Sequence, residues 1–289
     1  MLEGLERLEY RGYDSAGIAV LNDNNLTVCK TIERIKNLAE KTNNGKDIHG
    51  TTGIGHTRWA THGAPSDKNA HPHTSSDGKF AVVHNGIIEN YVALREELKA
   101  DGAEFKSETD TEVIPQLLAR CYTGDFFEAV AKTVKRLEGS YALGIICTDY
   151  PDTLIAVRKF SPLILGLSDD ANYIASDVTA IVSHTKDIMY IEDGEIAVLT
   201  PRGVKLYDGD KNELHREPAV INWDVSAAEK GGYDHFMMKE IMEQPAAVKQ
   251  TIESRIVGRE IVFEGLKLNA EMLKLSLIHI SEPTRQAEI

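Results

Sequence analysis

Residues His56 to His73, with the sequence HTRWATHGAPSDKNAHPH, gather four histidines, one arginine and one tryptophan in a single short segment. The Gly, Pro, Ser and Asn residues between them are typical of a loop, where binding and catalytic side chains are often held. Arg58 is either an ordinary surface cation or the residue that holds a substrate carboxylate, because a planar guanidinium binds carboxylates with paired hydrogen bonds.

Asn85 and Gly86 follow the apolar run FAVVH. Taken alone, this pair favours a tight turn after a strand. It also supplies a side-chain amide next to a backbone N–H, and these are the two donors that an oxyanion hole needs. The residues themselves leave both interpretations open.

The segment TDTE, Thr109 to Glu112, fits a helix capping box in which Thr109 is the N-cap and Glu112 reaches back to it. Asp110 then has no special role unless the ammonium group of a ligand lies beside it. Together with Arg58 and the Asn85-Gly86 pair, it describes a site for a free amino acid whose side-chain carbonyl is under attack.

The histidines offer a second hypothesis, a metal site, because His71 and His73 lie on one side of an extended segment. The segment has no cysteine partners, no HExxH helix and no standard ligand spacing. Local hydrogen bonding of polar histidines is the favoured interpretation, and we expect no metal and no other cofactor.

The three cysteines, Cys29, Cys121 and Cys147, lie within apolar strand or helix patterns. We predict that they are core residues rather than an attacking thiol. Their odd number and irregular spacing suit a reducing cytosol, so we expect a cytoplasmic protein.

The composition limits the classes of partner that the protein can bind. A chain of 289 residues with 42% hydrophobic residues can bury a large core, and its formal net charge of -13 argues against nucleic acid and anionic membranes as partners. Apolar runs such as YALGII are too short to span a bilayer.

The predicted elements occur in blocks. A short helix at 1–8 is followed by strands at 15–21 and 26–30 joined by a hairpin, and by strands on either side of the histidine-rich loop. A block of helices covers 91–138, short strands cover 141–207, and a last helix begins near residue 236 with Pro245 at a boundary. Blocks rather than strict alternation favour an α+β fold with antiparallel sheets and helices packed outside.

Five ordered blocks, LEYRGYDSAG, HTRWATHG, NAHPH, VHNGIIEN and SETDTE, resemble the glutaminase domain of the class II (N-terminal nucleophile) amidotransferases. A later block, EKGGYDHFMMKEIMEQP, resembles the branch of that family that aminates fructose 6-phosphate. The resemblance implies a four-layer α/β/β/α sandwich of the N-terminal-nucleophile hydrolase type, with L-glutamine as substrate and fructose 6-phosphate as acceptor in a further domain.

The resemblance also implies a role for each matching residue. Arg58 holds the glutamine carboxylate, Asp110 holds its ammonium group, and Asn85 and Gly86 form the oxyanion hole. Trp59, Thr61 and His62 match the loop that closes over glutamine, and His71 matches a supporting histidine in the same loop region.

The resemblance has one departure. The family begins with Met-Cys-Gly-Ile, whose cysteine is the nucleophile, and reaches the LEGL helix only after a short strand. We therefore expect roughly fifteen residues, the nucleophile among them, to be absent ahead of Met1. On that reading the chain alone binds glutamine poorly or not at all and is inactive.

The expected domains are a glutaminase domain at 1–225 and a linker with the start of the isomerase region at 226–274. Residues 275–289 begin with LSLIHISEPTR, the translation of a transposon-end sequencing adapter, and we expect them to be an artefact. The full-length protein is expected to be a homodimer. The alternatives are another class II amidotransferase, or a nucleophile-free domain that binds glutamine or mediates protein contacts.

Overall fold

The structure is a computed structural model that describes residues 1–12, 14–59, 63–221, 232–233, 235–253, 255–257 and 260–261. Thr61, His62 and the predicted artefact at 275–289 lie outside the described residues. The chain divides into two compact units, Met1–Glu229 and Lys230–Ile289. No helix in the described ranges is both long and apolar enough to cross a membrane.

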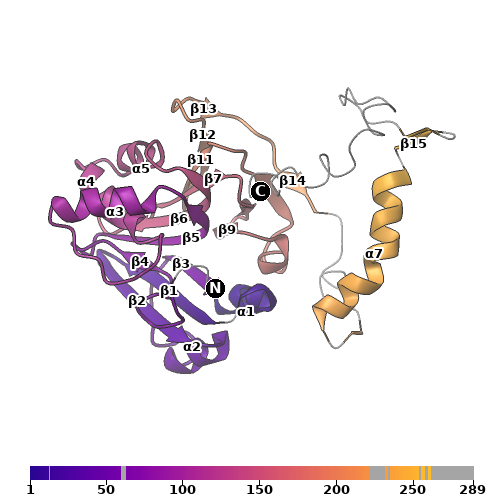
Figure 1. Cartoon of the computed structure of the whole chain (residues 1–289), viewed down its shortest axis with the longest axis horizontal. Helices are drawn as coiled ribbons and strands as arrows, with labels where there is room; N and C mark the ends of the chain where they lie inside the picture. Colours follow the sequence, from indigo (N-terminus) through magenta and orange to yellow (C-terminus); the bar gives the residue numbers. More distant parts are fainter. Residues whose placement is uncertain are drawn as a thin grey trace, which may run out of the picture. The chain divides into compact units, whose positions relative to one another are not determined.

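The first unit is built on an antiparallel seven-stranded sheet (Figure 1). Its order is β13-β12-β11-β7-β6-β5-β4, and the strands are β4 (His73–Thr74), β5 (Phe80–Ile88), β6 (Gly139–Cys147), β7 (Leu154–Lys159), β11 (Ile196–Thr200), β12 (Gly203–Tyr207) and β13 (Glu213–Leu214).

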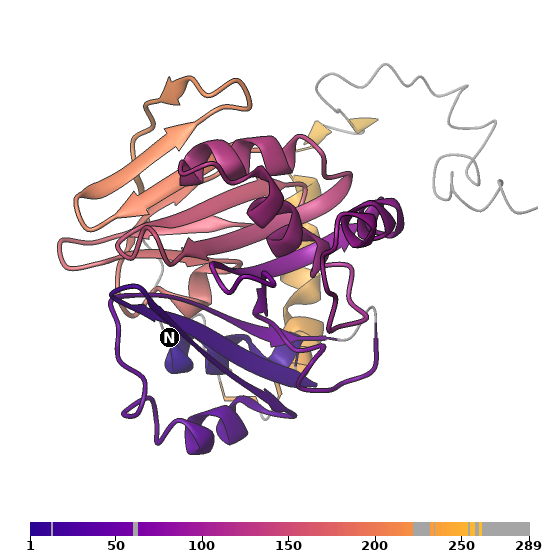
Figure 2. The same ribbon diagram turned by 90° about the vertical axis from the view of Figure 1, so that its left-hand side faces the viewer.

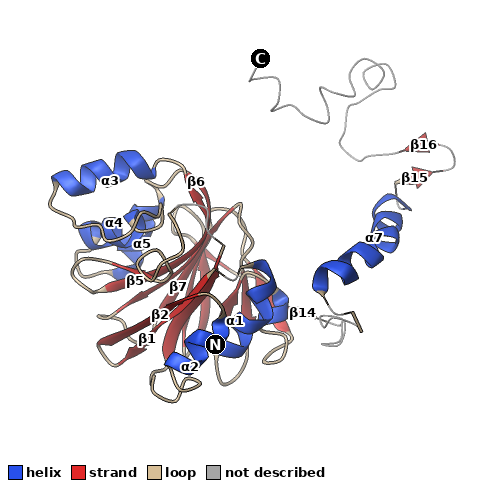
Figure 3. Ribbon diagram, turned by 60° about the horizontal axis from the view of Figure 1, so that its bottom comes forward, coloured by secondary structure: helices blue, strands red, loops and turns tan. Residues whose placement is uncertain are grey.

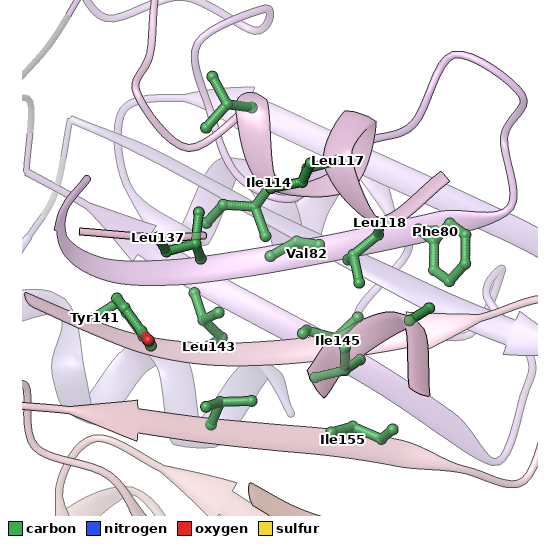
Figure 4. Packing of buried hydrophobic residues seen from close by; sticks show 14 of the residues in the cluster. Phe80, Val82, Ile114, Leu117, Leu118, Leu137, Tyr141, Leu143, Ile145 and Ile155 are labelled. Carbon is green, nitrogen blue, oxygen red and sulfur yellow. The ribbon is translucent and has the colours of Figure 1, made fainter. Parts of the chain in front are cut away.

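Three helices cover the outer face of this sheet: α3 (Tyr91–Ala100), α4 (Val113–Cys121) and α5 (Phe126–Val134). Figure 4 shows their contact with the sheet, where Ile114, Leu117 and Leu118 of α4 face Phe80 and Val82 of β5 in the largest buried cluster. Successive residues of a strand point to opposite faces, so Ala81 and Val83 join a different cluster on the inner face.

A second layer of strands faces the first sheet and is divided into two separate sheets (Figure 2). One has the order β2-β1-β3 and the other the order β14-β10-β8-β9. The strands are β1 (Ser15–Asn22), β2 (Asn25–Ile32), β3 (Thr52–Arg58), β8 (Ile164–Leu167), β9 (Asn172–Ala175), β10 (Asp187–Tyr190) and β14 (Ala219–Val220).

The outer face of this second layer carries α1 (Leu2–Leu8), α2 (Ile35–Lys41) and two 3-10 turns, Glu9–Arg11 and Val178–Ala180 (Figure 3). Leu5 of α1 and Leu38 of α2 pack on Ile18 of β1. The result is a four-layer α/β/β/α arrangement with antiparallel sheets, which confirms the predicted fold class.

The second unit contains α7 (Phe236–Glu253) and a short hairpin of β15 (Ile256–Val257) and β16 (Glu260–Ile261). The predicted boundary at Pro245 is wrong, because α7 continues through it. Proline lacks an N–H and so removes one hydrogen bond of the helix, but one lost bond in an 18-residue helix does not have to end it. The expected boundary between 225 and 226 stays a prediction.

Two local predictions are wrong. Asn85 and Gly86 do not form a turn. Both residues lie within β5 and are paired with Ala142 and Tyr141 of β6, because β6 offers hydrogen-bond partners along the whole length of β5. The capping box is also absent. Glu112 itself is the N-cap of α4, and its carboxylate accepts the N–H groups of Lys106 and Ser107 rather than that of Thr109.

The buried cluster between β6 and the helices predicts the effect of a cavity mutation. We expect Leu143→Ala, at a fully buried position, to lower the free energy of unfolding by about 2 to 5 kcal/mol. Val92→Ala on the exposed face of α3 is the control and should change it by less than about 0.5 kcal/mol. Urea unfolding of both variants tests this, and equal losses would show that the packing described here is wrong.

Candidate active site

One cavity of about 810 Å³ lies between the two layers of strands, and every described residue of the predicted site lines it. These residues come from four separate segments of the chain and are Arg58, Trp59, His71, Asn85, Gly86 and Asp110. The sequence places them up to 52 positions apart (110 − 58), so only the packing of the two layers brings them together.

Arg58 is the last residue of β3 and is only 4% exposed. Its Nη2 donates to the carbonyl oxygen of Gly63 at 3.0 Å, and its Nη1 lies 3.8 Å from Oδ1 of Asp14. Burial lowers the pKa of Arg58, and the charges of Asp14 and Asp110 oppose this shift. Asp14 is the carboxylate next to this buried guanidinium, and its 3.8 Å contact is a long one. The guanidinium is therefore suited to bind the carboxylate of a ligand as well.

Asp110 precedes α4 and is 3% exposed. Its Oδ2 accepts the backbone N–H of Ile88 at 2.8 Å, and its Oδ1 accepts the hydroxyl of Thr111 at 3.4 Å. These bonds fix the carboxylate against the end of β5. A buried cation and a buried anion on one cavity match the two charged groups of a free α-amino acid.

The side chain of Asn85 has a defined orientation because its Oδ1 lies 2.7 Å from Nε2 of His56. An amide oxygen only accepts, so Nε2 of His56 must carry the proton. The amide oxygen is therefore occupied, and the Nδ2 donor of Asn85 is the group left to meet a ligand. The sequence did not identify His56 as a site residue, since a partner 29 positions away leaves no local signal.

Gly86 has a φ of 127°, which side chains rarely adopt, and a Cβ there would collide with the carbonyl oxygen of Ser140. The N–H groups of His84 and Ile88 both point away from β6, to Nδ1 of His71 and Oδ2 of Asp110. Because alternate residues of a strand present their N–H groups to the same side, we expect the Gly86 N–H on this edge too.

The ring of His56, which is bonded to Asn85, belongs to a cluster of four histidine rings. The four residues are His56, His71, His73 and His84. The rings of His56 and His71 are 4.3 Å apart, and those of His71 and His73 are 4.9 Å apart. His84 contacts the Thr111 hydroxyl at 2.9 Å, and His73 contacts that of Thr109 at 3.1 Å. Among the described residues, no group of His, Cys, Asp and Glu has a metal-binding arrangement.

Burial keeps these rings neutral. It lowers the pKa of His56 to about 4, against the opposing hydrogen bond to Asn85, and it lowers the pKa of His71, His73 and His84 as well. A neutral imidazole has one donor and one acceptor nitrogen, so neutral His56 can still donate from Nε2 to Asn85.

The remaining predicted residues differ in their placement. Trp59 lines the cavity but is 60% exposed.

Cys29, Cys121 and Cys147 do not line the cavity. Burial also raises the pKa of Cys147 to about 11 and that of Cys29 above its usual value, which disfavours the thiolate form at both positions.

Comparisons with known proteins identify the family of the chain. The model of the glutamine amidotransferase domain family matches residues 56–183. The glutamine–fructose-6-phosphate aminotransferase (isomerizing) of Clostridium acetobutylicum is 54% identical over 275 residues, which cover 95% of this chain and 45% of that protein. The corresponding protein of Aquifex aeolicus is also 54% identical, with 92% of this chain and 45% of that protein covered.

Among solved structures, the glutamine phosphoribosylpyrophosphate amidotransferase from B. subtilis matches with a TM-score of 0.64 and 27% identity. The match covers 73% of this chain and 46% of that one. The family match and the fold therefore define a class II glutamine amidotransferase domain of the N-terminal-nucleophile type, as predicted.

Within that class, the chain belongs to the glutamine–fructose-6-phosphate aminotransferases, as their N-terminal glutamine amidotransferase domain. It spans about 45% of the length of the curated relatives that it matches. The predicted family is confirmed.

The histidine cluster predicts how stability depends on pH. The folded-state pKa of His56 is about 4, below the usual value near 6.5, so between these values the unfolded chain binds protons that the folded chain does not. The stabilising contribution is therefore complete above about pH 6.5 and is lost as the pH falls toward 4.

We expect the free energy of unfolding to fall by roughly 1 to 3 kcal/mol between pH 7 and pH 5, measured by urea unfolding at fixed ionic strength. His71→Gln, which removes one buried ring, should show a shallower dependence. A free energy of unfolding that stays constant over this range would contradict neutral burial of the cluster.

Proposed function

We propose that this chain is the glutamine-hydrolysing part of an amidotransferase that converts fructose 6-phosphate and glutamine into glucosamine 6-phosphate and glutamate. The observation that carries the proposal is the gathering of Arg58, Asp110, Asn85 and Gly86 on one cavity. A cation, an anion and an amide-bearing strand edge in one buried space match the carboxylate, the ammonium group and the side-chain carbonyl of glutamine.

In the proposed reaction, a cysteine thiol gives its proton to the α-amino group of the same cysteine and attacks the side-chain carbonyl carbon of glutamine. The α-amino group then passes this proton to the leaving nitrogen. The resulting oxyanion is stabilised by the Nδ2 of Asn85 and the N–H of Gly86, and the C–N bond then breaks to release ammonia. Water hydrolyses the thioester, which yields glutamate and returns the thiol. Since Cys29, Cys121 and Cys147 lie away from the cavity, we place the nucleophile on a segment ahead of Met1.

Trp59, Thr61, His62 and His71 are proposed to belong to the loop that closes over bound glutamine. The exposure of Trp59 at the cavity supports this role for Trp59, because a side chain that covers a ligand must be exposed before the ligand binds. His71 is buried, and its contacts with His56 and His84 support a positioning role.

The rest of the proposal concerns the whole protein. We propose a glutaminase domain at 1–225, a linker and the start of the isomerase region at 226–274, and binding of fructose 6-phosphate in the domains that follow. The name of the relatives, which pairs glutamine with fructose 6-phosphate, supports this acceptor. We further propose a cytoplasmic homodimer.

The first test uses glutamate release. We expect the purified 289-residue chain to release no glutamate from glutamine, because the cavity holds no thiol of this chain. A form extended ahead of Met1 by a segment that begins with cysteine should release it. If the unextended chain releases glutamate and a thiol-blocking reagent abolishes this activity, the proposed position of the nucleophile is wrong.

The second test separates binding from chemistry in the cysteine-bearing form. Asn85→Ala should lower kcat by about 10²- to 10³-fold with little change in KM, because the amide acts on charge that develops in the transition state. Asp110→Asn should raise KM by about 30-fold or more, because it leaves the ammonium group of glutamine without its partner.

The matched control for Asp110→Asn is Asp149→Asn. Asp149 is bound to Lys79 and Tyr122 at the surface and does not line the cavity. Its kinetic constants should stay within about twofold of the parent form. Similar losses in both variants would mean that Asp110 acts only through stability.

A further inference from the structure

Arg58 is tied to the loop that follows β3 by a hydrogen bond. Its Nη2 donates to the carbonyl oxygen of Gly63 at 3.0 Å, five residues further along the chain. A guanidinium holds its five N–H groups in one plane, so a fixed acceptor on one side directs the whole group. The residues that hold Gly63 in place therefore bear on the direction of Arg58.

Gly63 packs directly on the side chain of Asn69. A Cβ on Gly63 would lie 2.6 Å from Nδ2 of Asn69 and 3.1 Å from Cβ of Glu108, and the φ of Gly63 is 76°. A larger residue does not fit there unless one of these side chains moves. The next residue is bound to the same amide, because Nδ2 of Asn69 donates to the carbonyl oxygen of Ala64 at 2.8 Å.

The amide of Asn69 also binds Glu108 at two points. Its Oδ1 accepts the backbone N–H of Glu108 at 3.0 Å, and its Nδ2 donates to Oε2 of the same residue at 3.2 Å. The hydrogen bond from Asn69 and the charge of Lys68 lower the pKa of Glu108, so its carboxylate is an ionised acceptor at neutral pH. Asn69 itself is 1% exposed, and its donors and its acceptor are used inside the protein.

Glu108 lies two positions before Asp110, in a segment that is itself fixed. Nη2 of Arg95 donates to the carbonyl oxygen of Thr109 at 2.7 Å, and Oδ2 of Asp110 accepts the backbone N–H of Ile88 at 2.8 Å. The segment therefore has a defined position against α3 and β5.

A continuous path thus joins the cation and the anion of the candidate site. It runs from Arg58 to Gly63, through the amide of Asn69 to Glu108, and along the main chain to Asp110. The carboxylate and the ammonium group of an α-amino acid share one carbon, so their separation is fixed. A site that binds both groups needs its cation and its anion at a matching separation.

We propose that Asn69 is a positioning residue for substrate binding: it sets the separation of Arg58 and Asp110, and thereby the fit of the carboxylate and the ammonium group of a free α-amino acid. Asn69 does not line the cavity, so it acts through these residues and not by contact with the substrate. The inference rests on the proposed function, because it concerns how the substrate of that site is held.

The first experiment measures glutamate release by the cysteine-bearing form. Asn69→Ala should raise KM for glutamine about tenfold and leave kcat within about twofold, because the two charges hold the substrate and the transition state alike. An unchanged KM, or a loss confined to kcat, would overturn the inference.

Asn90→Ala is the matched control. The amide of Asn90 also donates to a carbonyl oxygen, that of Arg136 at 2.9 Å, and accepts the backbone N–H of a glutamate, Glu138, at 3.2 Å. Asn90 does not line the cavity. Both variants should unfold at lower urea concentration than the parent form, whereas KM should rise only in Asn69→Ala. A similar rise of KM in both variants would show that Asn69 acts through stability alone.

A double-mutant cycle identifies the residue through which Asn69 acts. In an Arg58→Lys background, Asn69→Ala should lower kcat/KM by less than about twofold, because lysine lacks the planar group that the carbonyl of Gly63 directs. If the two losses multiply instead, Asn69 does not act through Arg58 and the inference is wrong.

An exchange of the two polar groups provides a rescue. Asn69→Asp places a carboxylate against that of Glu108 and should raise KM at least as much as Asn69→Ala does. Adding Glu108→Gln restores an amide opposite a carboxylate and should recover about threefold of the loss. Recovery is partial because the carbonyl oxygen of Ala64 still lacks its donor. No recovery would contradict the direct coupling of positions 69 and 108.

The inference and the proposed function fail separately. Calorimetry with glutamine measures binding in the same variants without turnover. Turnover with the same KM in the parent form and in Asn69→Ala would overturn this inference alone. Glutamine binding that weakens in Asn69→Ala, without glutamate release by the parent form, would overturn only the proposed hydrolysis. A parent form that neither binds nor hydrolyses glutamine would overturn both.

Discussion

The pairing of β5 with β6 is the interaction on which the rest of the structure depends. The ladder runs from the pair Phe80 and Cys147 to the pair Ile88 and Gly139. The two strands lie between β7 and the short edge strand β4 of the seven-stranded sheet. One face of the pair forms the largest buried cluster with α4, and the other face lines the cavity. The donors of the candidate site therefore lie on a rigid strand rather than on a loop, which keeps their direction constant.

The same cavity contains polar groups that are costly to bury, and the structure compensates for them in two ways. Arg58 has the carboxylate of Asp14 beside it, and the carboxyl group of Asp110 accepts a backbone N–H. The histidines instead lose their charge, since burial lowers their pKa, and they then serve as neutral donors and acceptors. The cost of burying these groups limits stability at acid pH, while the resulting network holds Asn85 in one orientation.

The cavity lies where the second layer of strands is interrupted. Its amino-acid end is defined by charges on side chains, whereas its long part is defined by unpaired main chain between β3 and β9.

The sequence by itself determined the family, the fold class and most of the elements, because these depend on local pattern. The leucine spacing of α1, the asparagine hairpin between β1 and β2, and the motifs around Arg58, Asn85 and Asp110 can all be recognised within short windows. No element was predicted for the region that forms α2. The predicted start of α4 and the predicted boundary at Pro245 in α7 were wrong. Capping and helix continuation depend on contacts as well as on residue type.

Only the tertiary structure decided the role of Asn85-Gly86 and the partner of its side chain. The pair has the local sequence of a turn, yet it continues a strand because β6 offers hydrogen bonds along its entire length. His56 was invisible as a site residue because its bond to Asn85 joins two strands from different sheets. The gap between β3 and β9 has no signature in the sequence at all, since it is a relation between two edges more than a hundred positions apart. Local residue pattern encodes elements and motifs, whereas distances between elements arise only when the layers pack.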